Sequence, residues 1–189
     1  MVIIYQRIED VKDQVILFRP VYSDEGSITE IFMIDDKGMQ KTFDRRNIIS
    51  VRQAFARCFA LDLSAQAKDL QQKLNRKFPL PFYLPDSRVF IPLKMRKPLI
   101  IKDSTYGYVN ISYIKSVRKI NHEVVLTLTT NDKIPLYNTS SAAYNIINLG
   151  KGITDLVNNQ MQNEQERILD ALGILIDKLY RIEKILNKY

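Results

Sequence analysis

Apolar runs separated by short polar breaks near the N-terminus predict a meander of β-strands. The runs are rich in Val, Ile, Phe and Tyr, which favour extended backbone. They cover residues 2–8, 14–22 and 27–34. "DDKG" at 35–38 then predicts a tight hairpin turn, because Gly38 readily takes a positive φ. A fourth strand, "MQKTF", is expected directly after it.

The apolar spacing changes from two to three and four residues after Asn47, which predicts a helical insert. Asn47 or Asp44 is available to cap the first helix, and Ser64 to cap a second short one. "KFPLPFYLP" at 77–85 holds three prolines in nine residues, so we expect an extended connection there. The apolar positions that carry the helical spacing are Ile48, Val51, Phe55, Phe59, Leu70 and Leu74.

A second group of apolar runs predicts another antiparallel sheet. Strands are expected at 88–93, 99–103, 123–130 and 133–137, with "TTND" as a hairpin turn between the last two. The stretch "DSTYGYVNISYIKSVRK" (103–119) begins as an alternating strand. Its alternation breaks at Ile114, which predicts one helical turn capped by Asn110 before the next strand. Residues 140–149 then predict a serine-capped helix that ends before Gly150.

The last segment predicts a long amphipathic helix. Six apolar residues recur at intervals of 4, 3, 4, 3 and 4, which is the spacing of a coiled-coil seam. We therefore expect an oligomerisation helix, although docking on the chain's own domain stays open because further apolar residues widen the stripe. A membrane-surface helix is disfavoured, since 153–189 holds 5 basic and 6 acidic residues. The seam residues are Ile168, Leu172, Leu175, Leu179, Ile182 and Leu186.

These patterns together predict an α+β protein. A single domain at 1–150 would contain the strand meander, the helical insert and the second sheet, and 153–189 would form the C-terminal helix. The 189 residues, 46% of them hydrophobic, suffice for one such core. No apolar run reaches the roughly 20 residues that a membrane helix needs, so we expect a cytoplasmic protein with no membrane partner.

The net charge of +7 is distributed unevenly along the chain. Residues 41–119 contain 17 Lys and Arg against 5 Asp and Glu, a surplus of 12 positive charges. The remaining residues contain 11 against 16 and are therefore acidic. The basic segment 41–119 attracts acidic partners, of which nucleic acid is one and an acidic protein another.

Residues suited to catalysis or metal binding are scarce. His122 is the one histidine and Cys58 the one cysteine, which excludes a disulfide framework and a histidine metal cluster. We interpret Cys58 as a buried structural thiol and His122 as a turn residue. Phosphate-binding glycine loops and nucleophile-elbow motifs are absent. The sequence therefore predicts neither an enzyme, nor a metal site, nor a cofactor.

Clusters of basic residues are the strongest candidates for function. Guanidinium and ammonium groups placed close together neutralise phosphates and release counterions, which is the basis of DNA binding. Three stretches contain such clusters, "DRRNIISVR", "KMRKP" and "KSVRK". The predicted DNA-contacting residues are Arg45, Arg46, Arg52, Lys94, Arg96, Lys97, Lys115, Arg118 and Lys119.

A resemblance to a known family points the same way. The run from "LPDSRVFIPLKMRKP" to "DKIPLYNTS" resembles the central part of the ComK competence transcription factors of Gram-positive bacteria, over roughly residues 28–150. The shared outline includes Pro92-Leu93, Arg96-Lys97-Pro98, an aromatic strand entry near Tyr106 and a closing hairpin. A weaker likeness links "NISYIKSV" and "EVVLTLTTNDKIPL" to LytTR DNA-binding domains. The C-terminal heptad helix does not match the tail of the ComK proteins, so their control by degradation is not carried over.

The resemblance implies a transcription activator that binds A·T-rich DNA as an oligomer, largely through the minor groove. Arg and Lys suit that groove because A-tracts narrow it and concentrate its negative potential. We therefore expect a non-enzymatic DNA-binding regulator that forms homo-oligomers. A structural or protein-interaction module that assembles through the heptad helix is the alternative. A small-molecule sensor comes third and an enzyme last.

Overall fold

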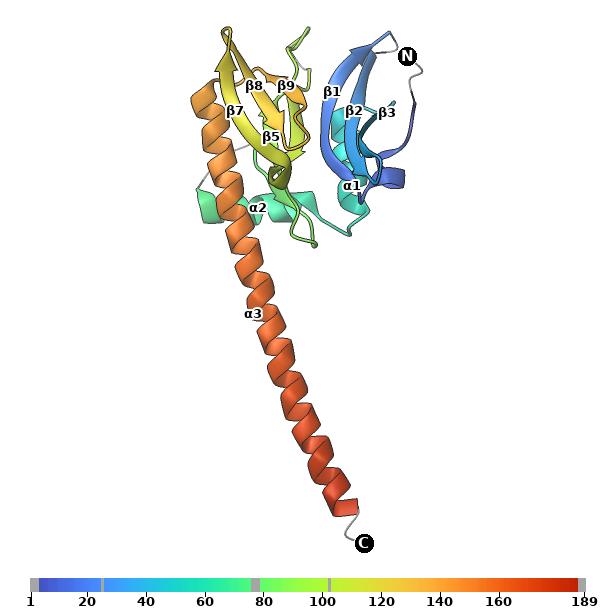
Figure 1. The fold of residues 1–189 in the computed structure, drawn as a ribbon, viewed down its shortest axis with the longest axis vertical. Helices are drawn as coiled ribbons and strands as arrows, with labels where there is room; N and C mark the ends of the chain where they lie inside the picture. Colours follow the sequence, from blue (N-terminus) through green and yellow to red (C-terminus); the bar gives the residue numbers. More distant parts are fainter. Residues whose placement is uncertain (1–3, 25, 76–78, 102, 187–189) are drawn as a thin grey trace. The chain divides into compact units, whose positions relative to one another are not determined.

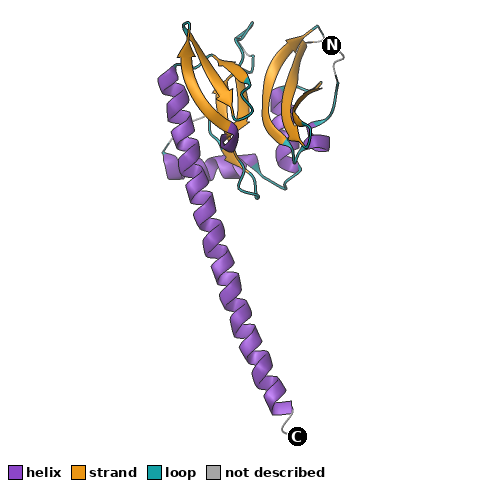
Figure 2. Cartoon of the chain, viewed as in Figure 1, coloured by secondary structure: helices purple, strands orange, loops and turns teal. Residues whose placement is uncertain are grey.

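A computed structural model describes residues 4–24, 26–75, 79–101 and 103–186 (Figure 1). The side chains of 177 and of 180–186 lie outside this description. Two compact units divide the chain, Met1–Lys151 and Gly152–Tyr189. The predicted α+β class is confirmed, since the first unit contains two antiparallel sheets with helices (Figure 2).

The larger sheet has six strands in the order β3-β2-β1-β6-β5-β4, with neighbouring strands antiparallel. Its N-terminal hairpins agree with the predicted meander, and Gly38 takes the expected positive φ of 102° between β2 and β3. The strands are β1 (Val15–Ser23), β2 (Gly26–Asp35), β3 (Gly38–Asp44), β4 (Phe82–Tyr83), β5 (Val89–Lys94) and β6 (Tyr106–Asn110).

The strand predicted at residues 2–8 is wrong for the described residues. Tyr5 makes only an isolated bridge with Phe43, and a 3-10 helix, η1 (Ile8–Val11), follows. Ile8 and Val11 are both buried. Because these two residues are three positions apart, their side chains lie on the same side of a 3-10 helix. Both can therefore cover the core, whereas in an alternating strand they would point to opposite faces.

The strand predicted at 99–103 is also wrong. Its described residues, 99–101 and 103, belong to no strand, because the Asp103 carboxylate accepts hydrogen bonds from the backbone N–H groups of Leu99 (2.8 Å) and Ile100 (3.1 Å). An aspartate that binds the backbone in this way competes with strand pairing. The side chains of Leu99, Ile100 and Ile101 consequently point to solvent.

Two helices pack near the six-stranded sheet, α1 (Ile48–Arg57) and α2 (Leu63–Leu74). Asn47 caps α1 as predicted, with its side chain accepting a hydrogen bond from Ser50 N at 3.0 Å. The prediction of Ser64 as the cap of α2 is wrong, since Asp62 accepts from both Ser64 N and Ala65 N. A carboxylate two residues earlier meets the free N–H groups directly.

Aromatic rings form the centre of the core between α1 and the sheet. Phe55 of α1 makes edge-to-face contacts with Phe90 at 5.3 Å and with Phe18 at 5.6 Å between centroids. Phe82 stacks on Phe90 at 5.3 Å. The predicted extended connection at 77–85 thus contains the short strand β4, which places Phe82 in this cluster. Residues 76–78 lie outside the described part.

The second sheet has three strands in the order β7-β8-β9. The prediction that the strand at 88–93 belongs to this sheet is wrong, because β5 pairs with β6 and β6 pairs with β1 in the larger sheet. They are β7 (Ile114–Ile120), β8 (Glu123–Leu128) and β9 (Lys133–Leu136). The predicted helical turn before β7 is confirmed as η2 (Ile111–Tyr113), with the Asn110 side chain accepting from Ser112 N. Beyond β9, the Lys94 carbonyl accepts from Tyr137 N at 2.8 Å, which ties the chain to the end of β5.

A single helix, α3 (Ser140–Leu186), follows the second sheet. The prediction that a helix ends before Gly150 is therefore wrong, as is the serine cap, because Thr139 Oγ1 accepts from Ala142 N. A Cβ on Gly150 would lie 2.5 Å from Cγ2 of Ile91 and 2.8 Å from Cδ1 of Ile111. Gly150 thus permits close packing inside a helix and does not end one.

Candidate anion-binding cleft

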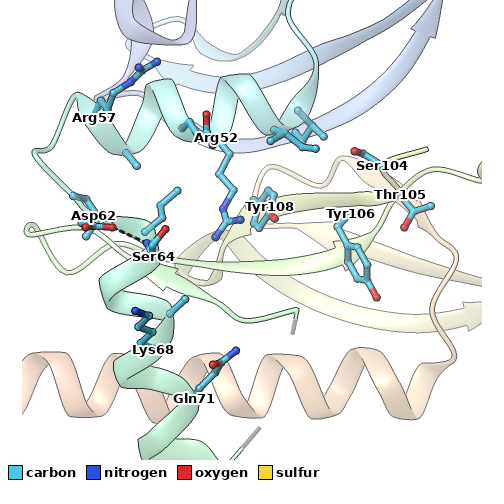
Figure 3. A pocket seen from close by; sticks show the side chains of 17 residues that line it. Arg52, Arg57, Asp62, Ser64, Lys68, Gln71, Ser104, Thr105, Tyr106 and Tyr108 are labelled. Atoms are coloured by element: carbon cyan, nitrogen blue, oxygen red, sulfur yellow. Dashed lines mark hydrogen bonds between the residues drawn. The ribbon is translucent and has the colours of Figure 1, made fainter. Parts of the chain in front are cut away.

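A cleft of about 700 Å³ lies between α1, α2 and the start of β6 (Figure 3). Helix α1 contributes Arg52 and Arg57, and α2 contributes Lys68. The opposite wall consists of Tyr106 and Tyr108 of β6. The remaining lining residues are Ile48, Ile49, Gln53, Ala56, Leu61, Asp62, Leu63, Ser64, Ala67, Gln71, Ser104 and Thr105.

The lining of this cleft is positively charged. Against its three cations it has one carboxylate, Asp62. Hydrogen bonds from Ala65 N and Ser64 N hold that carboxylate at the start of α2 and keep the pKa of Asp62 below its usual value. The ionised Asp62 therefore offsets one of the three positive charges and leaves the cleft lining with a net charge of +2.

Arg52 is held by aromatic rings. Its guanidinium carbon lies 5.0 Å from the centroid of Tyr108 and 5.5 Å from that of Phe82, within the range of cation–π attraction. Val51, Ala54 and Phe55 on the same helix are buried, so α1 is fixed against the core and Arg52 projects from its flank into the cleft (Figure 3). The rings orient the guanidinium without neutralising it.

One donor of Arg52 has no acceptor within the described residues. Nε is buried and lacks a hydrogen-bond partner. A buried guanidinium donor that forms no hydrogen bond is costly, by about 1–3 kcal/mol. Guanidinium groups fit carboxylate and phosphate oxygens, so Arg52 in the cleft lining suits an anionic ligand.

Tyr108 faces the cleft as a neutral hydroxyl. Burial raises the pKa of Tyr108, while the adjacent Arg52 cation acts in the opposite direction. The phenol therefore remains protonated at neutral pH and can donate a hydrogen bond. A smaller hollow of about 400 Å³ shares Arg52, Tyr106 and Tyr108 and extends to Pro79 and Leu80.

Two of the nine predicted DNA-contacting residues are engaged inside the protein. Arg46 forms an ion pair with Asp44 at 2.5 Å and donates to Glu9 at 2.8 Å. Arg96 is 6% exposed, donating to Ser104 O and to Ser27 Oγ. Because both guanidinium groups bind partners within the fold, Arg46 and Arg96 are not part of the candidate contact surface.

The other predicted residues remain open to solvent, apart from Arg52 in the cleft. Arg45 is exposed beside the Tyr5 ring, 4.6 Å from its centroid. Lys94 lies 5.9 Å from the Tyr106 centroid, next to the cleft wall. Lys115 is exposed and donates to Asn131 Oδ1 at 2.7 Å. Within the described part of the chain, no hydrogen bond or ion pair engages the side chains of three exposed cations, Lys97, Arg118 and Lys119.

Two cations of the cleft lining, Arg57 and Lys68, are not among the predicted DNA-contacting residues. Both lie on helices, where residues that share a surface are scattered along the chain. Lys68 has no basic neighbour in sequence, so no cluster marks it. The cleft forms only when β6 packs beside α1, which no short-range pattern reveals.

The remaining candidates for chemistry lie apart from the cleft lining. Cys58 is half-buried, and burial raises the pKa of its thiol, which disfavours a reactive thiolate. His122 is exposed in the β7–β8 turn with a φ of 70°, in keeping with a turn residue. Within the described residues there is no cluster of three or more His, Cys, Asp or Glu that could hold a metal ion.

In comparisons with known proteins, no family, no curated protein and no solved structure matches the chain. Among the helices that the structure describes, none is both long and apolar enough to cross a membrane.

Proposed function

We propose that the protein is a non-enzymatic regulator that binds DNA through the cleft and the exposed cations around it. The observation that carries this proposal is that Arg52, Arg57 and Lys68 all line one cleft, whose single lining carboxylate, Asp62, caps a helix. Such a site favours an anionic ligand, and its open, extended lining suits a chain of phosphates.

The surroundings of the cleft extend the positive surface along the fold. Lys94 lies beside Tyr106 on the cleft wall, and Lys97 follows shortly after it. Exposed Arg and Lys side chains position a protein on the phosphate backbone without reading sequence. Arg45, Lys115, Arg118 and Lys119 are further exposed cations available for such contacts.

The A·T preference rests on the resemblance to the ComK family and on the physics of the minor groove. A-tract grooves are narrow and strongly negative, and they attract inserted Arg and Lys side chains. Arg45 and Lys97 are exposed long cations that form no ion pair with another described residue, which suits that role.

Assembly through α3 is a second candidate activity, and it is compatible with DNA binding. Four residues of the predicted seam, Ile168, Leu172, Leu175 and Leu179, are 50–58% exposed in the second unit. The side chains of Ile182 and Leu186 lie outside the described part. Such a run of exposed apolar side chains is typical of a protein interface. We propose that a second copy of the chain covers it, giving a homo-oligomer.

The test of DNA binding is a comparison of the wild-type chain with Arg52→Gln and Arg57→Gln on one 30-base-pair A·T-rich duplex. Each substitution should weaken binding and reduce the slope of log K against log salt by about 1. Arg167→Gln on α3 removes an exposed cation outside the cleft and serves as the matched control. Equal losses for all three variants would mean that net charge, and not the cleft, governs binding.

A further inference from the structure

The loop between β5 and β6 presents three aliphatic side chains to solvent. Leu99 is 74% exposed, Ile100 is 67% exposed and Ile101 is fully exposed. Exposed aliphatic residues are ordinary when scattered, but three in succession at the tip of a loop form a projection. The fold of the first unit makes no use of these side chains in its core.

Hydrogen bonds hold the loop in this conformation. The Asp103 carboxylate accepts from Leu99 N and Ile100 N, and the Tyr22 hydroxyl of β1 donates to the same carboxylate. Leu99 N also donates to the Tyr22 oxygen at 2.9 Å. The base of the loop is closed by Thr105 O, which accepts from Met95 N at 2.9 Å. Tyr22 and Asp103 thus form a frame that fixes the backbone of the apolar tip, Leu99–Ile101, while the side chains of the tip stay exposed.

The cleft and the loop share a segment of chain. Ser104 and Thr105 line the cleft and directly follow the frame residue Asp103. Lys94 and Lys97 flank the other side of the loop in sequence, and both are exposed. The apolar tip thus lies within a few residues of the cleft wall, with two exposed lysines on its N-terminal side.

We propose that Leu99–Ile101 is an apolar wedge that enters the minor groove and partly unstacks a base step of bound DNA. This inference rests on the proposed function. Aliphatic side chains inserted between base pairs kink DNA by about 20–90°, and cations beside the wedge hold the flanking phosphates. Pyrimidine–purine steps such as TA unstack most easily, so the wedge selects them within A·T-rich sites.

The concave cleft favours DNA over a lipid surface as the partner. A duplex offers phosphates on both sides of the groove that would receive the tip, which suits a tip that has the exposed Lys94 and Lys97 close to it in sequence. A flat bilayer that receives the loop tip would leave Arg52 without an anion, because its guanidinium lies against Tyr108 and Phe82. The same recess disfavours a flat protein surface.

The test uses the full chain and a duplex with 2-aminopurine beside a central TA step in an A·T-rich site. Leu99→Ser/Ile100→Ser/Ile101→Ser removes the wedge, and Leu156→Ser, which alters a residue that is 49% exposed on α3, is the matched control. Binding of the wild-type chain should raise 2-aminopurine fluorescence at least threefold. It should also bend the duplex, which is measured by resonance energy transfer between dyes at the two ends of the duplex. The triple variant should lose both signals and about tenfold in affinity, with its salt slope unchanged.

Three outcomes would overturn the wedge. If the triple variant binds, bends and unstacks like wild type, the loop has no part in DNA binding while the proposed function stands. If wild type binds DNA without unstacking, the loop contacts only the backbone. If neither protein binds DNA but wild type alone binds vesicles of 30% phosphatidylglycerol in phosphatidylcholine, the loop is a lipid contact and the proposed function fails too. Tyr22→Phe, which keeps the apolar tip and loosens its frame, should give a partial loss of bending if the wedge is correct.

Discussion

The guanidinium carbon of Arg52 lies 5.0 Å from the ring centroid of Tyr108, at the junction of α1 and β6. This contact aims a cation into the cleft and holds it there. A lysine at the same position would keep the charge but lose the planar stacking and the several donors of the guanidinium.

Arg52→Lys and Arg52→Gln should therefore separate geometry from charge. We expect DNA affinity to fall about threefold for the lysine variant and about tenfold for the glutamine variant. Only the glutamine variant should also lower the salt slope, by about 1, because it alone removes a charge that releases a counterion. Fluorescence anisotropy over a series of salt concentrations measures both quantities. A lysine variant that binds as tightly as wild type would show that stacking on Tyr108 has no role.

The ion-pair group of Arg46, Glu9 and Asp44 should stabilise the fold without contacting DNA. Arg46→Gln leaves Asp44, which is 3% exposed in its side chain, without its cation. Removing one partner of a fully buried pair costs about 3–5 kcal/mol, and about 2 kcal/mol is expected here because Arg46 and Glu9 are about one-third exposed. Urea unfolding measures this loss. The folded Arg46→Gln variant should bind DNA as tightly as wild type, which would show that Arg46 stabilises the fold and, unlike Arg52, does not contact DNA.

The same group predicts how stability depends on pH. Hydrogen bonding to Arg46 lowers the pKa of Glu9. Burial works to raise the pKa of Asp44, but hydrogen bonds from Arg46 and Ile8 outweigh it and the pKa is lowered. Carboxylates with lowered pKa stabilise the fold fully above their unfolded values of about 4 and lose this effect as the pH falls further.

The urea midpoint of the wild-type chain should thus stay level from pH 7 to about pH 5 and fall below pH 4. In Arg46→Gln the difference between pH 7 and pH 3 should shrink, because the two carboxylates lose the cation that lowers their pKa. An equal pH dependence in both proteins would contradict the assignment of the acid sensitivity to this group.

Two glycines of α3 should respond in opposite directions to alanine. Gly150→Ala places a Cβ 2.5 Å from Ile91 Cγ2, and overpacking of this kind costs about 1–3 kcal/mol. Gly173 has no atom within 4 Å of such a Cβ, so Gly173→Ala should stabilise the helix by up to about 1 kcal/mol. Thermal unfolding followed by circular dichroism measures both. A destabilising Gly173→Ala would indicate a close neighbour at that position.

Self-assembly should depend on the exposed seam of α3. Leu172→Glu/Leu175→Glu introduces like charges where a second copy would pack, and should weaken self-association at least 100-fold in sedimentation equilibrium. Asn163→Glu is the control, because nine residues of helix place it about 180° from Leu172. A wild-type chain that is monomeric at every concentration would contradict the oligomerisation proposal.

The sequence predicted most regular elements because their signals are local. Gly38 marks a hairpin, Asn47 a helix start and Asn110 a helical turn, each through its own backbone or side-chain chemistry. The failures arose where a distant contact decides the local structure. Asp103 and Tyr22, 81 residues apart, turn an apolar run into a loop, and Gly150 packs against Ile91 instead of ending a helix.

The candidate site was predictable only in part. Basic clusters in sequence marked Arg52 and Lys94, both of which lie at or beside the cleft. The same clusters also contain Arg46 and Arg96, whose guanidinium groups bind partners inside the protein. Arg46 donates to Glu9, 37 residues away, and Arg96 donates to Ser27, 69 residues away. A charge count along the chain cannot distinguish a cation facing solvent from one facing a buried carboxylate or hydroxyl, since that depends on tertiary packing.

The most direct test of the central claim is binding of the full chain to A·T-rich and G·C-rich duplexes of equal length across a salt titration. We predict tight binding at low salt, a steep decrease in affinity as salt rises, and at least a tenfold preference for the A·T-rich duplex. Negligible affinity for both duplexes at 50 mM salt would contradict DNA binding and leave assembly through α3 as the remaining activity.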